Sequence, residues 1–441
     1  MNLRKLLREP ALPVGMFGIA AAILGFVREQ VIAAQLGLST ATDAYYLALS
    51  VCVFLPGIVN AASSGILAAH HAKAVRERGE AYGKTQLGRI LLVCGGLSLT
   101  AIAFLGVAGG IAYPFLAASR NVEKLHLMLQ LAACLALAIP ALSVTTAAVG
   151  ALNVQGKYIL GGASTIVAPI TASLVLLVAP ASPWSAAGGL VLGLNLQAAL
   201  LLAGLRRLGV SPWQKIHWAY LAKTLKDMGH LAMGAVVANS TALVIQAVVA
   251  SHGARSTSTY SFGIKITAAY LGLSVMFFST LLNPIFAARA NGLPYSQKRL
   301  RAYLWLAGTS TMAATAILTF GSADIIRLVL KRGAFSESDV AAVAGVHAFA
   351  ALQIPTYLFS ALCARLVAAY HDTRFLGRMS WLQAAIAMSL LWPLHQALGI
   401  RGLVLANAVA FAVIGACLFW RHQQLKTEAQ APSTHPTVGG A

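Results

Sequence analysis

The sequence predicts an all-α polytopic membrane protein of about twelve transmembrane helices, arranged as two six-helix pseudo-symmetric lobes around a central cavity. Of its 441 residues, 58% are hydrophobic and only 10% are charged, whereas a soluble domain carries about 25% charged residues. The mean hydropathy is +0.75. These values exclude an ordinary soluble protein.

Twelve apolar segments are long enough to cross the hydrocarbon core of a bilayer, which takes roughly 17 to 25 helical residues. They lie near residues 12–36, 42–69, 90–117, 126–151, 158–180, 185–205, 230–251, 259–286, 302–321, 340–366, 379–399 and 402–420. Pro169 interrupts the fifth segment. An even number of spans places both termini on the same side of the membrane.

The basic residues collect in alternate loops. Of the 32 Lys and Arg residues, 22 fall at the termini and in every second loop, seven fall in the intervening loops and three lie within spans. Short cytoplasmic loops are enriched in Lys and Arg, so both termini are predicted to be cytoplasmic. The net charge of +20 is therefore spread over successive loops, which suits anionic lipid headgroups. A nucleic-acid-binding protein would concentrate its positive charge on one face, so no nucleic-acid partner is expected here.

The chain divides into two halves of six spans each. Residues 1–205 are expected to form an N-terminal lobe and residues 230–420 a C-terminal lobe. Between them, residues 206–229 are basic with interleaved aromatic residues, a pattern typical of an amphipathic helix at the cytoplasmic interface. Residues 421–441 are expected to form a disordered cytoplasmic tail. Transporters built from repeats commonly bind their substrate between them, which predicts a central site.

Ionisable residues inside the predicted spans are the main functional signal. A charge at the bilayer centre costs at least about 2.5 kcal/mol, so it usually faces a partner or a water-filled cavity. We therefore assign Arg28, Glu29, Asp43 and Lys265 to a transport cavity. Arg28 and Glu29 are sequence neighbours and lie about 100° apart on a helix, so each is expected to have a partner other than its neighbour.

Several of these residues have a structural alternative. Asp43 either pairs with Arg28 or caps the start of the second span, and Lys265 either faces the cavity or extends its stem to the interface. Arg365, near the cytoplasmic end of the tenth span, is interpreted first as an interfacial anchor. Polar residues within the spans are interpreted as joining helices rather than lining a cavity: Asn153, Asn195, Gln197, Asn239, Gln246, Gln353, Gln383, His395 and Asn407.

The sequence contains no pattern typical of catalysis or metal binding. Its five cysteines lie in apolar runs without metal-ligand spacing, and His70 and His71 are adjacent with no carboxylate cluster nearby. A GxxxxGK[ST] nucleotide-binding motif is absent. A membrane glycosyltransferase or acyltransferase needs acidic or histidine residues at an aqueous face, but the longest loop, of about 25 residues, has Asp227 as its sole carboxylate. We expect neither an enzyme nor a cofactor.

Four short stretches together resemble one family. They are residues 24–29 (LGFVRE), residues 41–46 (ATDAYY), residues 331–339 (KRGAFSESD), and Arg365 followed by residues 372–374 (DTR). These stretches are similar to the first two helices, the loop before the tenth helix and the arginine and Asp-Thr-Arg signature of the MurJ/MviN lipid II flippase family. That family belongs to the multidrug/oligosaccharidyl-lipid/polysaccharide exporter superfamily. The resemblance covers most of residues 1–420.

The resemblance implies a monomeric flippase of the bacterial cytoplasmic membrane that works by alternating access for cell-envelope synthesis. Its cargo would be a polyprenyl-diphosphate-linked saccharide, lipid II or a close analogue, and its other partners the membrane lipids. Arg28, Glu29 and Asp43 would correspond to the family's residues on helices one and two, and Lys265 to its arginine on helix eight. Arg365, Asp372 and Arg374 would form a gate or a structural signature.

The chain departs from the family pattern at several positions. Ala22 stands where the lipid II flippases have a further arginine, and residues 56–60 (PGIVN) stand where they have basic residues, so the cavity is expected to be less cationic. Family members usually have fourteen helices, against about twelve expected here. An exopolysaccharide or O-antigen repeat-unit flippase is therefore the alternative. A multidrug antiporter is less favoured, because a cavity containing Arg28 and Lys265 repels cationic drugs.

Overall fold

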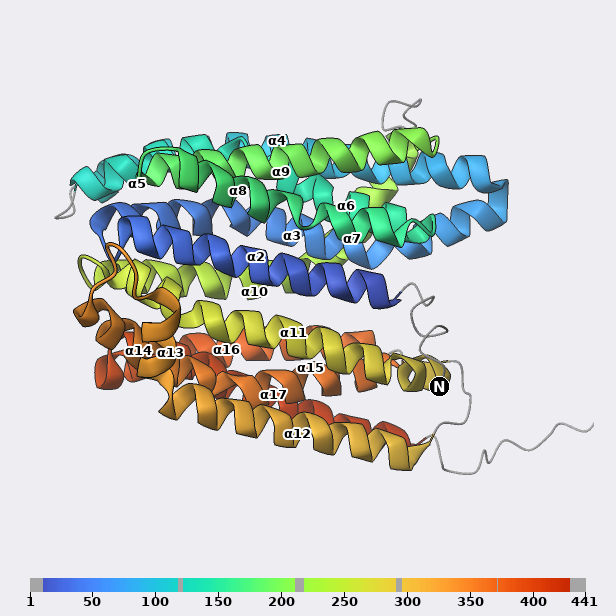
Figure 1. Cartoon of the computed structure of the whole chain (residues 1–441). Coiled ribbons are helices and arrows are strands. Elements are labelled where there is room, and N and C mark those ends of the chain that lie inside the picture. Colours follow the sequence, from blue (N-terminus) through green and yellow to red (C-terminus); the bar gives the residue numbers. More distant parts are fainter. Residues whose placement is uncertain (1–10, 118–121, 211–217, 291–295, 371, 429–441) are drawn as a thin grey trace, which may run out of the picture.

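The computed structural model describes residues 11–117, 122–210, 218–290, 296–370 and 372–428, and within these ranges it contains helices and no strand. The long helices run side by side along a common direction, with the two halves of the chain in adjacent bodies (Figure 1). This arrangement confirms the expected all-α membrane fold with two lobes.

Within the described ranges, the N-terminal body contains eight helices, α2 to α9, in the order of the chain (Figure 1). They are α2 (Ala11–Leu36), α3 (Thr40–Arg78), α4 (Glu80–Ala117), α5 (Val122–Ala136), α6 (Ile139–Val154), α7 (Tyr158–Ser164), α8 (Val167–Val178) and α9 (Pro183–Arg207). Its two largest groups of buried side chains lie around α3, which packs against α4, α5 and α6. This long helix is the centre of the lobe and also borders the second lobe.

The described part of the C-terminal body contains eight further helices. They are α10 (Trp218–Ser251), α11 (Ser256–Ala290), α12 (Gln297–Phe320), α13 (Ser322–Leu330), α14 (Glu337–Ala351), α15 (Gln353–Ala368), α16 (Thr373–Leu398) and α17 (Ile400–Glu428). Helices α2 and α3 of the first body contact α10 and α11 of the second, and the candidate site lies in this interface.

Each of the twelve predicted spans coincides with one helix or with two consecutive helices. Within the described ranges, nine helices are long and apolar enough to cross a membrane, and the bent pair α5–α6 makes a tenth. The structure thus confirms a polytopic membrane protein, and the count of twelve remains a prediction.

Proline residues stand just after the breaks in the divided spans. Helices α5 and α6 meet at 41°, with Pro140 in the first turn of α6, and α14 and α15 are separated by Leu352, with Pro355 in the first turn of α15. The expected interruption near Pro169 is likewise a break between α7 and α8. Proline is tolerated in a first turn because no backbone N–H is needed there. The fourth span of each lobe thus consists of two helices, although the bend exceeds 40° in the α5–α6 pair and not in the α14–α15 pair.

The segment between the lobes differs from the expected interfacial helix. Helix α9 ends at Arg207 and α10 begins at Trp218, from which it continues without a break through the seventh span to Ser251. Residues 211–217 lie outside the described ranges. Helix α17 extends to Glu428, so the first part of the expected disordered tail is helical, and residues 429–441 also lie outside those ranges.

The two lobes meet at one end of the bundle through a contact that only glycine permits. The Ala334 amide, in the loop between α13 and α14, donates to the Ala34 carbonyl at 2.7 Å. Gly37 (φ +54°) and Gly333 (φ +55°) both adopt the left-handed conformation, and a Cβ atom on either would overlap a backbone atom of the other lobe. We call residues Ala34, Gly37, Gly333 and Ala334 the outer contact, because they lie at the end of the bundle that the distribution of basic loop residues predicts to face away from the cytoplasm.

Substituting Gly333→Ala is expected to open the outer contact. The change costs roughly 1–2 kcal/mol for a left-handed non-glycine residue, and its methyl group also overlaps the Ala34 carbonyl. Hydrogen–deuterium exchange of the Ala334 amide should become faster. The matched control is Gly79→Ala, which has the same kind of backbone strain (φ +83°) but no atom within 4 Å of the new Cβ. Equal exchange in both variants would contradict the expectation.

Candidate transport site

A buried carboxylate, Glu29 on α2, is the centre of an ion cluster. Its side chain is 4% exposed, and its Oε1 atom lies 2.5 Å from Arg28 Nη2 and 3.1 Å from Lys265 Nζ. The Tyr46 hydroxyl donates to Oε2 at 2.6 Å. Both carboxylate oxygens are therefore hydrogen-bonded, as a buried charge requires.

The pairing of Arg28 with Glu29 corrects the expectation that neighbours on a helix are poor partners. Their Cα–Cβ directions diverge, but the long arginine side chain bends across the gap until its guanidinium meets the carboxylate. Lys265 then approaches the same carboxylate from α11. We call Arg28, Glu29, Tyr46 and Lys265 the ion cluster.

The ion cluster joins the two lobes, because Lys265 comes from α11 and the other three residues come from α2 and α3. Lys265 Nζ also lies 5.5 Å from the centre of the Tyr46 ring, within the range of a cation–π contact. Its side chain is 30% exposed, compared with 16% for Arg28 and 4% for Glu29. Lys265 is thus the most exposed of the three charged members of the cluster.

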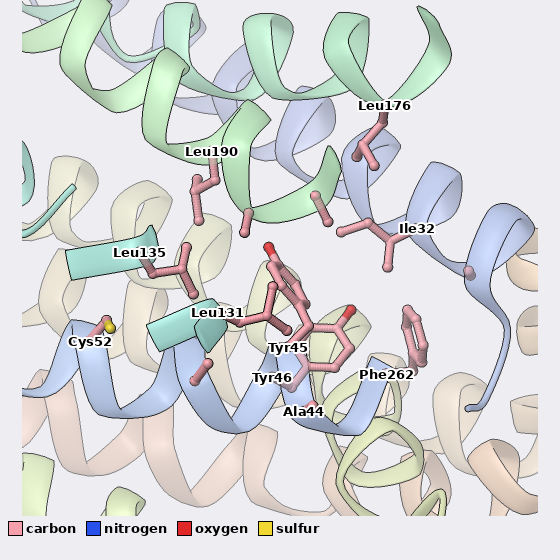
Figure 2. Close-up of a cluster of buried hydrophobic side chains, with 14 of the residues drawn as sticks. Ile32, Ala44, Tyr45, Tyr46, Cys52, Leu131, Leu135, Leu176, Leu190 and Phe262 are labelled. Carbon is pink, nitrogen blue, oxygen red and sulfur yellow. The ribbon is translucent and has the colours of Figure 1, made fainter. Parts of the chain in front are cut away.

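Aromatic side chains pack around Tyr46 of the ion cluster. Tyr46 packs edge-on against Tyr45 and Phe262, with ring centroids 5.3 and 5.4 Å apart, and Phe262 packs against Phe335 at 5.8 Å. Figure 2 shows Tyr45 and Tyr46 between Leu131 of α5 and Phe262 of α11. All of these side chains are buried. Residues of both lobes therefore fix the position of the Tyr46 hydroxyl.

Asp43 belongs to a second buried ion pair. Its Oδ2 atom accepts from Lys124 Nζ at 2.8 Å, and its Oδ1 atom accepts from the backbone N–H and the hydroxyl of Ser258, each at 2.7 Å. Asp43 therefore pairs with Lys124 rather than with Arg28. It is not the helix cap either, since Ser39 caps α3. Through Ser258 of α11, this pair also joins the two lobes.

The sequence patterns did not identify three residues of the site: Lys124, Ser258 and Tyr46. Lys124 counted there only as a loop residue on the non-cytoplasmic side, but it lies in the first turn of α5 with its side chain buried. The buried positions 124, 131 and 135 of α5 recur at helical spacing. That periodicity was the available signal, because it places a lysine on the face of α5 that turns inward. Ser258 and Tyr46 carried no comparable signal.

The second group of predicted residues lies apart from the ion cluster. Arg365, in the last turn of α15, and Arg374, at the start of α16, are exposed. Asp372 caps α16 by accepting from the Phe375 N–H at 3.2 Å and also pairs with Arg421 of α17 at 2.9 Å. Asp372 thus joins two helices of the C-terminal lobe, and a gating role for these three residues remains a prediction.

A cavity of about 550 Å³ lies between α3 and helices α10, α11, α15 and α17. The predicted cavity residues Arg28, Glu29, Asp43 and Lys265 do not line it. Ser50 of α3 and Ile264 and Ala268 of α11, which are close to Tyr46 and Lys265 in the sequence, do. Four amide side chains face this space: Asn239, Gln246, Gln353 and Asn407. The interpretation that these amides only join helices was wrong, because a helical pattern alone does not distinguish a polar residue at a packed interface from one at a cavity wall.

Substituting Asp43→Asn is expected to lower the stability of the protein by about 3–5 kcal/mol, because the buried Lys124 ammonium loses its carboxylate. Lys124→Met should be similarly harmful, and combining both changes should recover part of the loss. The measurement is thermal unfolding of the purified variants as a double-mutant cycle. Strictly additive losses would show that the two side chains are not coupled.

Comparison with known proteins agrees with this architecture. "Probable lipid II flippase MurJ" of Rhizobium meliloti (strain 1021) is 24% identical over 450 residues, covering 92% of this chain and 80% of the relative. The protein of the same description from Rhizobium tropici is 25% identical over 429 residues, covering 90% and 77%.

Solved structures show the same fold at lower identity. The inward closed conformation of lipid II flippase MurJ matches with a TM-score of 0.79 at 18% identity, covering 94% of this chain and 90% of that one. An inward-facing multidrug resistance MATE family transporter of the MOP superfamily matches at 0.71 and 12% identity, covering 93% and 96%. The family described as lipid II flippase MurJ matches over residues 32–434, and the chain therefore belongs to the MurJ lipid II flippase family.

Proposed function

We propose that this protein moves a polyprenyl-diphosphate-linked saccharide, lipid II or a close analogue, from the cytoplasmic to the outer leaflet of the bacterial cytoplasmic membrane. It does so as a monomer with both termini in the cytoplasm. The observation that carries the proposal is the ion cluster, in which one buried carboxylate binds a cation from each lobe. Peptidoglycan synthesis is the process that uses such a cargo.

The charges of the ion cluster suit a diphosphate. Arg28 and Lys265 share one carboxylate, which leaves one positive charge in excess. A diphosphate has more negative charge and more acceptor oxygens than Glu29, so it competes for both cations, and an arginine fork matches phosphate geometry. Glu29 neutralises these cations when no cargo is bound and thereby lowers the cost of keeping them inside the membrane.

Competition for Lys265 also links cargo binding to movement of the lobes. The Glu29–Lys265 pair is one connection between the lobes, and the Asp43–Ser258 bonds and the outer contact are others. A diphosphate that removes Lys265 from Glu29 breaks the first connection and weakens the closed arrangement of the outer end. A ligand shifts a conformational equilibrium only through such a difference in interaction between states.

The reduced number of basic residues does not favour another cargo. With Ala22 and residues 56–60 uncharged, the diphosphate depends more strongly on Arg28 and Lys265. The family match and the descriptions of the curated relatives favour lipid II over an exopolysaccharide or O-antigen repeat unit. The likeness to MATE transporters extends to the fold alone.

Substituting Arg28→Ala or Lys265→Ala is expected to weaken binding of a polyprenyl-diphosphate saccharide about 10- to 150-fold, since a hydrogen bond to a charged group contributes about 1.5–3 kcal/mol. Lys265→Arg should retain binding. Titration of the purified variants measures the effect, with Lys73→Ala, an exposed basic position, as the control. Unchanged affinity in both alanine variants would overturn the assignment of the ion cluster.

Substituting Glu29→Gln separates binding from transport. The variant keeps both cations and removes their competitor, so the affinity for the diphosphate should stay equal or rise. Transport should fall, because the lobes lose one of their connections. Affinity is measured by the same titration, and transport by rescue of cells depleted of their own lipid II flippase. Weaker binding by Glu29→Gln would show instead that the carboxylate contacts the cargo directly.

The rescue experiment also distinguishes the cargo. The wild-type chain, confirmed in the membrane by immunoblot, is expected to restore growth of the depleted strain. Failure at full expression, together with restored export of a lipid-linked exopolysaccharide unit in a strain lacking that flippase, would replace lipid II with the alternative cargo.

A further inference from the structure

A large groove lies on the C-terminal lobe between α12, α15 and α17. Its volume is about 1040 Å³, and most of its surface is apolar, with Leu304, Trp305, Leu358, Phe359 and Phe419 among the lining residues. Helix α12 lies at the outer margin of this lobe (Figure 1). In a membrane, the open side of the groove therefore meets lipid.

The groove and the central cavity lie on opposite faces of α15. Gln353 and Tyr357 line the cavity, whereas Thr356 and Phe359 line the groove. No residue of α2 or α11 within the described ranges lines the groove. It is thus separated by one helix from the space beside the ion cluster, and its occupant does not have to be the transported cargo.

The two ends of the groove differ in chemistry. Arg301, near the start of α12, and Lys426, near the end of α17, both line it at the end where the basic loops lie, and the structure gives neither an acidic partner in the described part of the chain. Further along α12, the lining residues Trp305 and Met312 are 73% and 59% exposed. An apolar channel with cations at one end fits an amphipathic molecule with an anionic headgroup.

We propose that this groove binds an anionic glycerophospholipid. Its acyl chains lie along Trp305, Met312 and Phe359, and its phosphate meets Arg301 and Lys426 at the basic end of the bundle. Charge complementarity selects this occupant over a zwitterionic lipid, and over a second copy of a chain with a net charge of +20. The proposal does not depend on the identity of the transported saccharide.

The test compares how well the purified full chain retains phosphatidylglycerol and phosphatidylcholine of identical acyl chains, measured by native mass spectrometry without cargo. Wild type should prefer phosphatidylglycerol roughly 30-fold, because each basic residue near the membrane surface contributes about 1 kcal/mol. Arg301→Gln with Lys426→Gln should abolish this preference. The charge-matched control is Lys298→Gln with Arg299→Gln, exposed neighbours on α12 that do not line the groove, and it should keep the preference.

A second variant tests the apolar part of the site. Gly308 lines the groove, and a Cβ there meets no atom within 4 Å, so Gly308→Leu fills the groove without disturbing α12. It should reduce retention of both lipids. An unchanged preference in the Arg301 and Lys426 variant, an equal loss in the charge-matched control, or full retention by Gly308→Leu would overturn the proposal. Displacement by an equimolar polyprenyl phosphate would also overturn it, by assigning the groove to the cargo's lipid tail.

Discussion

The need to compensate one buried carboxylate brings three helices of the two lobes together. Glu29 is almost completely enclosed, and an ionised carboxylate in that environment is stable only with several donors. Arg28 comes from the same helix, Tyr46 from the next helix and Lys265 from the other lobe. Because no single helix supplies all three donors, the charge itself requires α2, α3 and α11 to meet. The aromatic packing of Tyr45, Tyr46 and Phe262 then gives this meeting point a fixed shape.

Asp43, nearer the end of the bundle, is a second buried carboxylate whose donors come from different helices. It is fully buried, its ammonium partner comes from α5 and its backbone donor from α11. The lysine partners of the two carboxylates differ in accessibility, however. Lys124 is 10% exposed, whereas Lys265 is 30% exposed. The first pair is suited to holding helices together, and the second is suited to exchanging its partner for a solute anion. The proposed division of roles follows from this difference.

The sequence predicted the fold well, because apolar length and proline position act locally. The spans follow from runs of about 20 residues, and Pro140, Pro169 and Pro355 each lie just after a break. The partners of the charges were harder to predict. The pairing of Arg28 with Glu29 depends on how one side chain bends, and Asp43 meets Lys124 and Ser258, which are 81 and 215 residues away. Such contacts depend on how the lobes pack against each other, and the periodicity of a single helix carries no information about that packing.

The fourth span of each lobe consists of two helices, α5 and α6 in the first lobe and α14 and α15 in the second. The first helix of each pair is held in place by hydrogen bonds near the outer contact. In α5 the bond comes from Lys124, and next to α14 it comes from the loop that contains Ala334. The second helix of each pair, α6 or α15, begins after the break. The run of backbone hydrogen bonds is interrupted at each break, so bending there costs less than bending within a continuous helix. We therefore expect any relative motion of the two ends of the bundle to concentrate at these two breaks, while the hydrogen bonds of the outer contact stay formed.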